Sequence, residues 1–213
     1  MNIDTNVRSV LDRDWHWPRK DKGAWMYLTN PKHLYFPFEI KTLCSRFSKV
    51  IQAGGHCGLY GYQYSLFFDN VYTFEPDTKN HFCLTKNLSE LSNVEIFNFG
   101  LGDKEELVSL NANVKNSGGI SVDQNTPGNI PIKRIDDLNL DCDLIHLDLE
   151  GFELFALKGS IETIKRCKPV IVVETNESSD NYGYTKQDLI DYIISLGYKV
   201  VKEWEDDVAF SPL

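Results

Sequence analysis

The sequence predicts an α/β protein with a mostly parallel sheet of about seven strands, one antiparallel strand near its C-terminal end, and helices on both faces. From Val50 onward, short runs of β-branched and aromatic residues alternate with longer helical stretches, which is the pattern of βαβ units. Only Glu205 and Asp206 separate the last two predicted strands. Because this connection has no room for a crossover helix, those two strands must run antiparallel.

The alternation assigns each element to a stretch of the chain. Predicted strands occupy residues 49–53, 70–75, 94–99, 143–149, 169–175, 198–204 and 207–211. Predicted helices occupy residues 59–68, 78–91, 152–165 and 186–196. Asp77 or Thr78 is suited to cap the second helix and Thr185 the last, because their side-chain oxygens accept hydrogen bonds from first-turn N–H groups.

Two segments depart from the alternation. Residues 104–135 indicate a hairpin inserted into the α/β series, and its turn at residues 116–119 either covers an acceptor or only reverses the chain. Residues 1–45 are expected to form a capping segment of a single domain whose main part is residues 46–213. Within the capping segment, Trp15-His16-Trp17 would form an aromatic lid over a cofactor or pack the segment onto the core.

The charge balance argues against polyanionic partners. Lys and Arg number 22 and Asp and Glu 31, giving a net charge of −9, whereas proteins that bind the nucleic-acid backbone usually carry excess basic residues. We therefore expect neither nucleic acid nor an anionic membrane as a partner. The five cysteines occur singly, no apolar run approaches the ~18 residues of a membrane helix, and the N-terminus lacks a signal-like apolar stretch. These features predict a cytoplasmic protein.

Glycines follow the first predicted strand, where open α/β sheets bind their ligands. Gly54 and Gly58 are spaced G-x-x-x-G at the start of a helix, and glycines there let the backbone approach a ligand closely. The dinucleotide fingerprint G-x-G-x-x-G is absent because position 56 is His, and no phosphate-binding P-loop motif occurs. The alternative is that these glycines only permit close helix–strand packing.

An acidic residue follows the second predicted strand. Glu75 lies 75 − 54 = 21 residues beyond the first glycine, where a carboxylate accepts hydrogen bonds from ribose hydroxyls. A glycine loop and a ribose-binding acid without a phosphate site suit an adenosine ligand that carries an amino acid. The pattern therefore predicts S-adenosylmethionine as cofactor.

Five segments together resemble a known family. In chain order they are VIQAGGHCGLYG, YTFEPD, IPIKRIDDL, LIHLDLEGFELFALKGS and PVIVVETNE, spanning Val50 to about Glu177. As a set they resemble the FkbM family of S-adenosylmethionine-dependent methyltransferases. The resemblance implies a Rossmann-like class I methyltransferase fold for residues 46–213, and S-adenosylhomocysteine as the product of the cofactor.

The resemblance also has departures. Gln52 stands where the family usually has Asp, Gly55 and His56 where it has Ala and Asn, Arg134 for Thr, and His146 for Lys. Gln52 still donates and accepts hydrogen bonds but lacks a negative charge. These differences leave open an alternative, a non-catalytic binding or interaction module that retains the fold.

Carried over residue by residue, the resemblance implies a cofactor site. The residues around the methionine portion, the ribose and the adenine are expected to be Gln52, Gly54, Gly55, His56, Gly58, Glu75, Pro76, Phe99, Gly100 and Leu101, with Asp148 orienting the amino group. Methyl transfer to a hydroxyl needs a general base within hydrogen-bond reach. Asp148 and Glu150 are the favoured bases, with Glu174 and His146 behind them.

Alternatives remain for the candidate general bases. His146 lies within a central strand, where a buried, hydrogen-bonded histidine is the structural interpretation. The carboxylates of Asp148, Glu150 and Glu174 could instead bind Mg²⁺, but without an oxygen-rich loop we predict no metal. The expected reaction is O-methylation of a small-molecule or glycan hydroxyl. A nucleic-acid base methyltransferase is disfavoured by the acidic balance.

Overall fold

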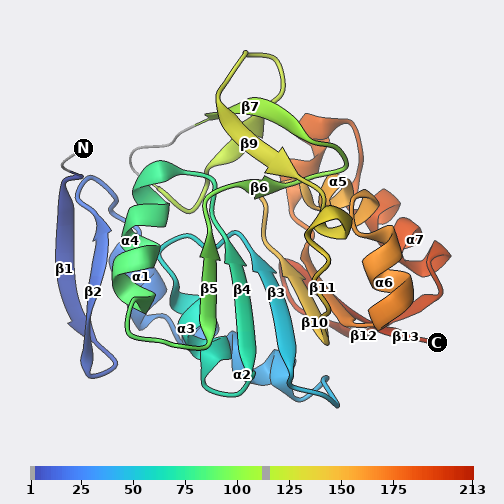
Figure 1. Ribbon diagram of the computed structural model, residues 1–213, viewed down its shortest axis with the longest axis horizontal. Coiled ribbons are helices and arrows are strands. Elements are labelled where there is room, and N and C mark those ends of the chain that lie inside the picture. Colours follow the sequence, from blue (N-terminus) through green and yellow to red (C-terminus); the bar gives the residue numbers. More distant parts are fainter. Residues whose placement is uncertain (1–2, 112–115) are drawn as a thin grey trace.

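A seven-stranded sheet forms the centre of the molecule (Figure 1). The computed structural model describes residues 3–111 and 116–213. The strand order is β12-β13-β11-β10-β3-β4-β5. The strands are β3 (Lys49–Ala53), β4 (Asn70–Phe74), β5 (Val94–Phe97), β10 (Leu144–Leu147), β11 (Val170–Glu174), β12 (Tyr198–Glu203) and β13 (Asp207–Pro212). β13 runs antiparallel to both of its neighbours, β11 and β12, and the other pairs of this sheet are parallel, so the predicted sheet and its reversed strand are confirmed.

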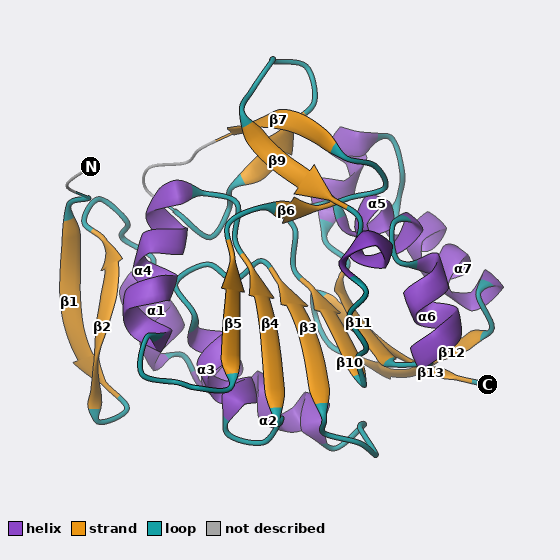
Figure 2. Cartoon of the chain, in the orientation of Figure 1, coloured by secondary structure: helices purple, strands orange, loops and turns teal. Residues whose placement is uncertain are grey.

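Helices cover both faces of this sheet, as predicted (Figure 2). Strands β3, β10 and β11 are mostly apolar on both faces because each face is buried. One face packs against α5 (Glu153–Lys158), α6 (Ile161–Cys167) and α7 (Lys186–Ser195). The other packs against α2 (Pro31–Lys41) and α3 (Leu59–Ser65).

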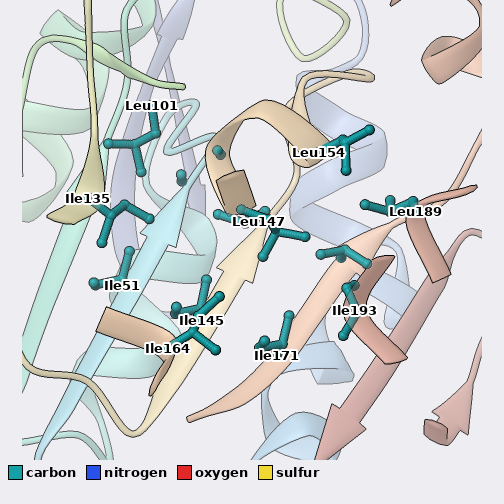
Figure 3. Packing of buried hydrophobic residues seen from close by; sticks show 14 of the residues in the cluster. Ile51, Leu101, Ile135, Ile145, Leu147, Leu154, Ile164, Ile171, Leu189 and Ile193 are labelled. Carbon is teal, nitrogen blue, oxygen red and sulfur yellow. The ribbon is translucent and has the colours of Figure 1, made fainter. Parts of the chain in front are cut away.

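The register of the three central strands explains the larger core. Ile145 of β10 pairs with Ile51 of β3 and Ile171 of β11, which places three isoleucines in one row across the sheet. Side chains in such a row point to the same face. Figure 3 shows them packed with Ile164 and Ile193 from α6 and α7. The alternate strand positions contribute to the core beneath α2 and α3.

Two predicted elements differ in the structure, where one is divided and the other is shorter. The predicted helix 152–165 is split into α5 and α6 at Gly159 and Ser160. A Cβ on Gly159 would lie 1.9 Å from the carbonyl oxygen of Gly102, so the helix end contacts another backbone directly. The predicted strand 94–99 ends at Phe97, and Gly100–Leu101 instead form β6 of a second sheet.

The inserted segment forms most of this second sheet, above the carboxyl ends of the central strands (Figure 1). Its order is β6-β9-β7-β8, with β7 at Glu106–Asn111, β8 at Ser121–Asp123 and β9 at Ile130–Lys133. The antiparallel pairing of β7 with β8 is the predicted hairpin, although residues 112–115 lie outside the described part. The added pairing with β9 and β6 was not predicted. The short helix η1 (Ile135–Leu138) follows.

The N-terminal segment packs along α4 (Thr78–Leu88). It forms the hairpin β1–β2 (Thr5–Val10 and Arg13–Pro18), followed by α1 (Ala24–Thr29). Trp15 and Trp17 are completely buried in a cluster with residues of α3 and α4. They pack the segment onto the core, so these two rings form no open lid. Among the described helices, none is long and apolar enough to cross a membrane.

The predicted helix caps are present. Asp77 accepts hydrogen bonds from Lys79 N and Asn80 N at the start of α4, both at 2.9 Å. Thr185 forms a capping box with Asp188 at the start of α7. The remaining short helix, η2 (Glu177–Tyr182), follows β11.

The close approach at Gly159 gives a stability prediction. We expect Gly159→Ala to lower the free energy of unfolding by about 1–3 kcal/mol, because the new methyl group would collide with the Gly102 backbone. Gly61→Ala is the control, since its Cβ would meet the Leu88 side chain at 3.1 Å and no backbone. Urea unfolding followed by circular dichroism measures both. An unchanged midpoint for Gly159→Ala would contradict the packing described for this junction.

Candidate active site

A cavity of about 910 Å³, including its part open to solvent, lies at the carboxyl ends of β3, β4 and β10. Its floor comes from the loops that follow these strands. Its roof comes from the N-terminal segment and from the second sheet. The lining includes Tyr27, Gly54, Gly55, His56, Tyr60, Glu75, Pro76, Asn80, Gly100, Leu101, Ser117, Gly118, Asp148, Glu150 and Phe152.

Gly54 is where the glycine loop meets the end of β10. A Cβ on Gly54 would lie 1.9 Å from the carbonyl oxygen of Asp148, and its φ of +85° is in the left-handed region. Both features require glycine. Gly58, with φ +95°, does not line the cavity; a Cβ there would meet Leu84 and Leu88 of α4. Gly54 thus joins two parts of the site, whereas Gly58 permits helix packing.

Gln52 lies beneath the loop and outside the lining. Its Nε2 donates to the carbonyl oxygen of Gly54 at 3.0 Å, and its Oε1 accepts from the hydroxyl of Thr73 at 2.6 Å. An ionised aspartate could not donate to that carbonyl. This fully buried amide therefore holds the glycine loop from below, which is a positioning contact.

Glu75 lines the cavity and is 5% exposed. Its Oε2 accepts from the backbone N–H of His56 at 2.7 Å and its Oε1 from that of Asp77 at 2.8 Å. Burial raises the pKa of this carboxyl to about 8, against the lowering effect of the two hydrogen bonds. Each oxygen retains a further lone pair for a ligand hydroxyl.

The residues predicted to hold an adenine ring divide into two groups. Pro76, Gly100 and Leu101 line the cavity. Phe99 does not, because its ring packs against those of Phe74 and Phe97. It supports the wall from behind.

Three carboxylates meet at the opposite side of the site. Asp148, Glu150 and Glu174 each offer an oxygen, and these oxygens lie within 4.8 Å of one another, close enough to hold a divalent cation. Asp148 and Glu150 line the cavity, whereas Glu174 hydrogen-bonds to Asp148 from β11. Burial raises the pKa of all three, most strongly for Glu174, and brings that of Glu150 to about 8. Burial and the neighbouring carboxylates therefore favour the protonated form of Glu174 over that of Asp148.

His146 lies outside the cavity lining, on the side of β10 covered by α2 and α3. It is 1% exposed, and its Nδ1 hydrogen-bonds to the Tyr64 hydroxyl at 2.8 Å. Burial lowers its pKa to about 3, so the ring is neutral. Of its two sequence interpretations, this placement favours the buried structural histidine.

Several lining residues were not predicted. Tyr27 of α1 and Tyr60 of α3 face the carboxylate side, where His33 stacks on Tyr27 at 4.4 Å and hydrogen-bonds to the Tyr60 hydroxyl at 3.0 Å. Asn80 of α4 and Ser117 of the inserted segment also line the cavity. Ser117 and Gly118 of the 116–119 turn line the cavity, and whether the turn covers an acceptor stays a prediction. No local pattern marks these residues, because they come from separate segments.

The strand order, the reversed β13 and the cavity at the carboxyl ends define a class I methyltransferase fold. Solved structures share it. The methyltransferase FkbM from Methylobacillus flagellatus is 24% identical with a TM-score of 0.56, over 77% of this chain. A SAM-dependent methyltransferase from Aquifex aeolicus is 16% identical with a TM-score of 0.53, over 91% of this chain and 99% of its own. M. jannaschii TYW2 in complex with AdoMet is 12% identical with a TM-score of 0.53, over 98% of this chain and 87% of its own.

The family model described as "Methyltransferase FkbM domain" matches residues 61–200, and the chain belongs to this family. The match includes Glu75, Asp148, Glu150 and Glu174 and begins after the glycine loop. The chain spans 43% of the length of the Methylobacillus flagellatus protein. No curated protein matches the chain.

The raised carboxyl pKa values give a pH prediction. Because the folded pKa of Glu150 lies above its unfolded value, its favourable contribution is present below pH 4.5 and is lost as the pH rises through about 8. The thermal midpoint of the ligand-free protein should therefore fall between about pH 5 and 8. Glu150→Gln should flatten this fall, with Glu177→Gln, an exposed glutamate, as control. Differential scanning fluorimetry measures the thermal midpoint across this pH range. The same fall in Glu150→Gln as in the parent protein would contradict the prediction.

Proposed function

We propose that this protein transfers a methyl group from S-adenosylmethionine to a hydroxyl oxygen of a small-molecule or glycan acceptor. The main supporting observation is the contact between Gly54 and the Asp148 carbonyl, which brings the glycine loop and the carboxylates to one cavity. Membership of the FkbM methyltransferase family agrees with this assignment. A cytoplasmic location and the absence of nucleic-acid substrates remain part of the proposal.

The cavity residues fit the cofactor. Glu75 has oxygens free to accept two ribose hydroxyls while the backbone N–H groups of His56 and Asp77 hold it in place. Pro76, Gly100 and Leu101 supply an apolar wall for adenine. The glycine loop at Gly54 and Gly55 would hold the methionine portion. Two solved structures of this fold, M. jannaschii TYW2 and S. mutans SMU.1697c, contain AdoMet and SAH respectively.

The cofactor supplies a methyl group on a positively charged sulfur, which needs alignment more than activation. In this proposal Asp148 and Glu150 have two tasks. Their negative charges favour a cationic ligand, and that ligand in turn lowers their pKa toward the ionised form. One of them then accepts the proton of the acceptor hydroxyl as the methyl group is transferred. Tyr27 and Tyr60 border the acceptor side and restrict water.

The alternative of a non-catalytic module depends on Gln52 and His146, which differ from the residues usual in the family. Both side chains have structural tasks away from the cavity lining: Gln52 bridges Thr73 and Gly54, and His146 bonds to Tyr64. Their departure from the family pattern therefore does not remove a group from the cavity. The enzyme proposal is favoured for this reason.

Cofactor binding tests the ribose assignment. Glu75→Gln should raise the Kd of S-adenosylhomocysteine about tenfold, because one carboxylate acceptor becomes a donor that faces a backbone N–H. Isothermal titration calorimetry measures this change. Glu95→Gln, an exposed glutamate on β5, should bind as the parent does. Equal affinity for parent and Glu75→Gln would refute the ribose assignment.

Methyl transfer tests the catalytic assignment. With tritiated S-adenosylmethionine and a panel of monosaccharides and simple alcohols, the parent should label at least one acceptor. One of the two variants Asp148→Asn and Glu150→Gln removes the general base. That variant should lower kcat about 100-fold while S-adenosylhomocysteine still binds. Glu177→Gln is the control. Cofactor binding without labelling of any hydroxyl acceptor would favour the non-catalytic module.

A further inference from the structure

Asp21 is a buried carboxylate in the turn after β2, on the roof side of the cavity. Its side chain is 1% exposed. It accepts hydrogen bonds from Trp17 Nε1 at 2.7 Å, Gly23 N at 2.6 Å, and both the N–H and the hydroxyl of Ser117 at 3.2 and 2.5 Å. Burial acts to raise its pKa, but these bonds bring the pKa below its usual value. Asp21 is therefore ionised and fully partnered.

Ser117 connects Asp21 to the cofactor loop. Because its hydroxyl donates to Asp21, its oxygen accepts from Nε2 of His56 at 2.7 Å. Burial lowers the pKa of His56 to about 4, so the ring is neutral and these bonds assign its proton to Nε2. Trp17 and Tyr27 contact the same ring edge-on, with centroids 4.7 and 5.4 Å away. The imidazole is held on several sides.

The backbone of His56 completes the connection. Its φ of +46° is in the left-handed region, and its N–H donates to Oε2 of Glu75 at 2.7 Å. A hydrogen-bonded series thus runs from Asp21 through Ser117 and His56 to Glu75. Asn80 adds a second tie, since its Nδ2 donates to the carbonyl oxygen of Ser117 at 2.8 Å. Roof and floor of the cavity are joined at this point.

We propose that Asp21 is a positioning residue for the cofactor site, acting through Ser117 and His56 to hold Glu75 in its binding orientation. The N-terminal segment and the insert then both contribute to cofactor affinity through this series of hydrogen bonds. A non-glycine residue with positive φ needs support from its surroundings, and this series supplies it for His56. The inference rests on the proposed cofactor site.

A double-mutant cycle on S-adenosylhomocysteine binding tests it. Asp21→Asn would place an NH₂ group against donors, and His56→Asn removes the ring while keeping a residue that tolerates positive φ. Each should raise Kd about tenfold by calorimetry, and the double variant should be no weaker than either single one. Ser117→Ala should give a similar loss. Asp4→Asn, an exposed aspartate of the same segment, is the control and should bind as the parent does.

The outcomes separate the two levels of the proposal. If the parent protein fails to bind S-adenosylhomocysteine, the proposed function is wrong. If the parent binds but Asp21→Asn and Ser117→Ala bind equally well, the positioning role is wrong. If the Asp21 and His56 losses add in the double variant, Asp21 acts independently of His56 and the inference is also overturned. A change in the imidazole ¹⁵N spectrum of His56 in Asp21→Asn would independently support the connection.

Discussion

The contact between Gly54 and the carbonyl oxygen of Asp148 is the constraint on which the site depends. The backbones of the β3 loop and the β10 end approach so closely that no side chain fits between them. The N–H of Asp148 also donates to the carbonyl oxygen of Ala53 at 3.1 Å, and the N–H groups of Gly54 and Gly55 bond to Phe74 at the end of β4. Three strand ends are thereby joined, so loops that are far apart in sequence form one cavity.

The buried charges of the cavity oppose folding. Carboxyl groups removed from water and placed beside one another disfavour ionisation, which is why the pKa values of Glu75, Glu150 and Glu174 are all raised by burial. Such groups persist at functional sites because a ligand, here one with a positive charge, compensates them. Asp21 is the exception, since four protein hydrogen bonds keep it ionised without a ligand.

The sequence predicted the central sheet and the strand-end residues because both have local patterns. Apolar runs that alternate with helical stretches predicted the strands. Residues directly after the strands, such as Glu75 and Asp148, line the cavity because the carboxyl ends of parallel strands lie at one edge of the sheet. The residues that hold the site in place from outside the cavity have no local sequence pattern. Asp21 and Ser117 are 96 residues apart, and whether Gln52 or Gly58 faces the cavity depends on packing beneath the loop. The split of helix 152–165 likewise depends on a distant backbone, that of Gly102.

A crystal structure of the protein with S-adenosylhomocysteine would test the central claim most directly. We predict that the ribose hydroxyls lie within hydrogen-bond distance of Glu75, and that the sulfur faces Asp148 and Glu150 across the cavity beneath Ser117. A ligand bound with its ribose away from Glu75, or with its sulfur directed away from both carboxylates, would contradict the assignment of this cavity as the methyl-transfer site.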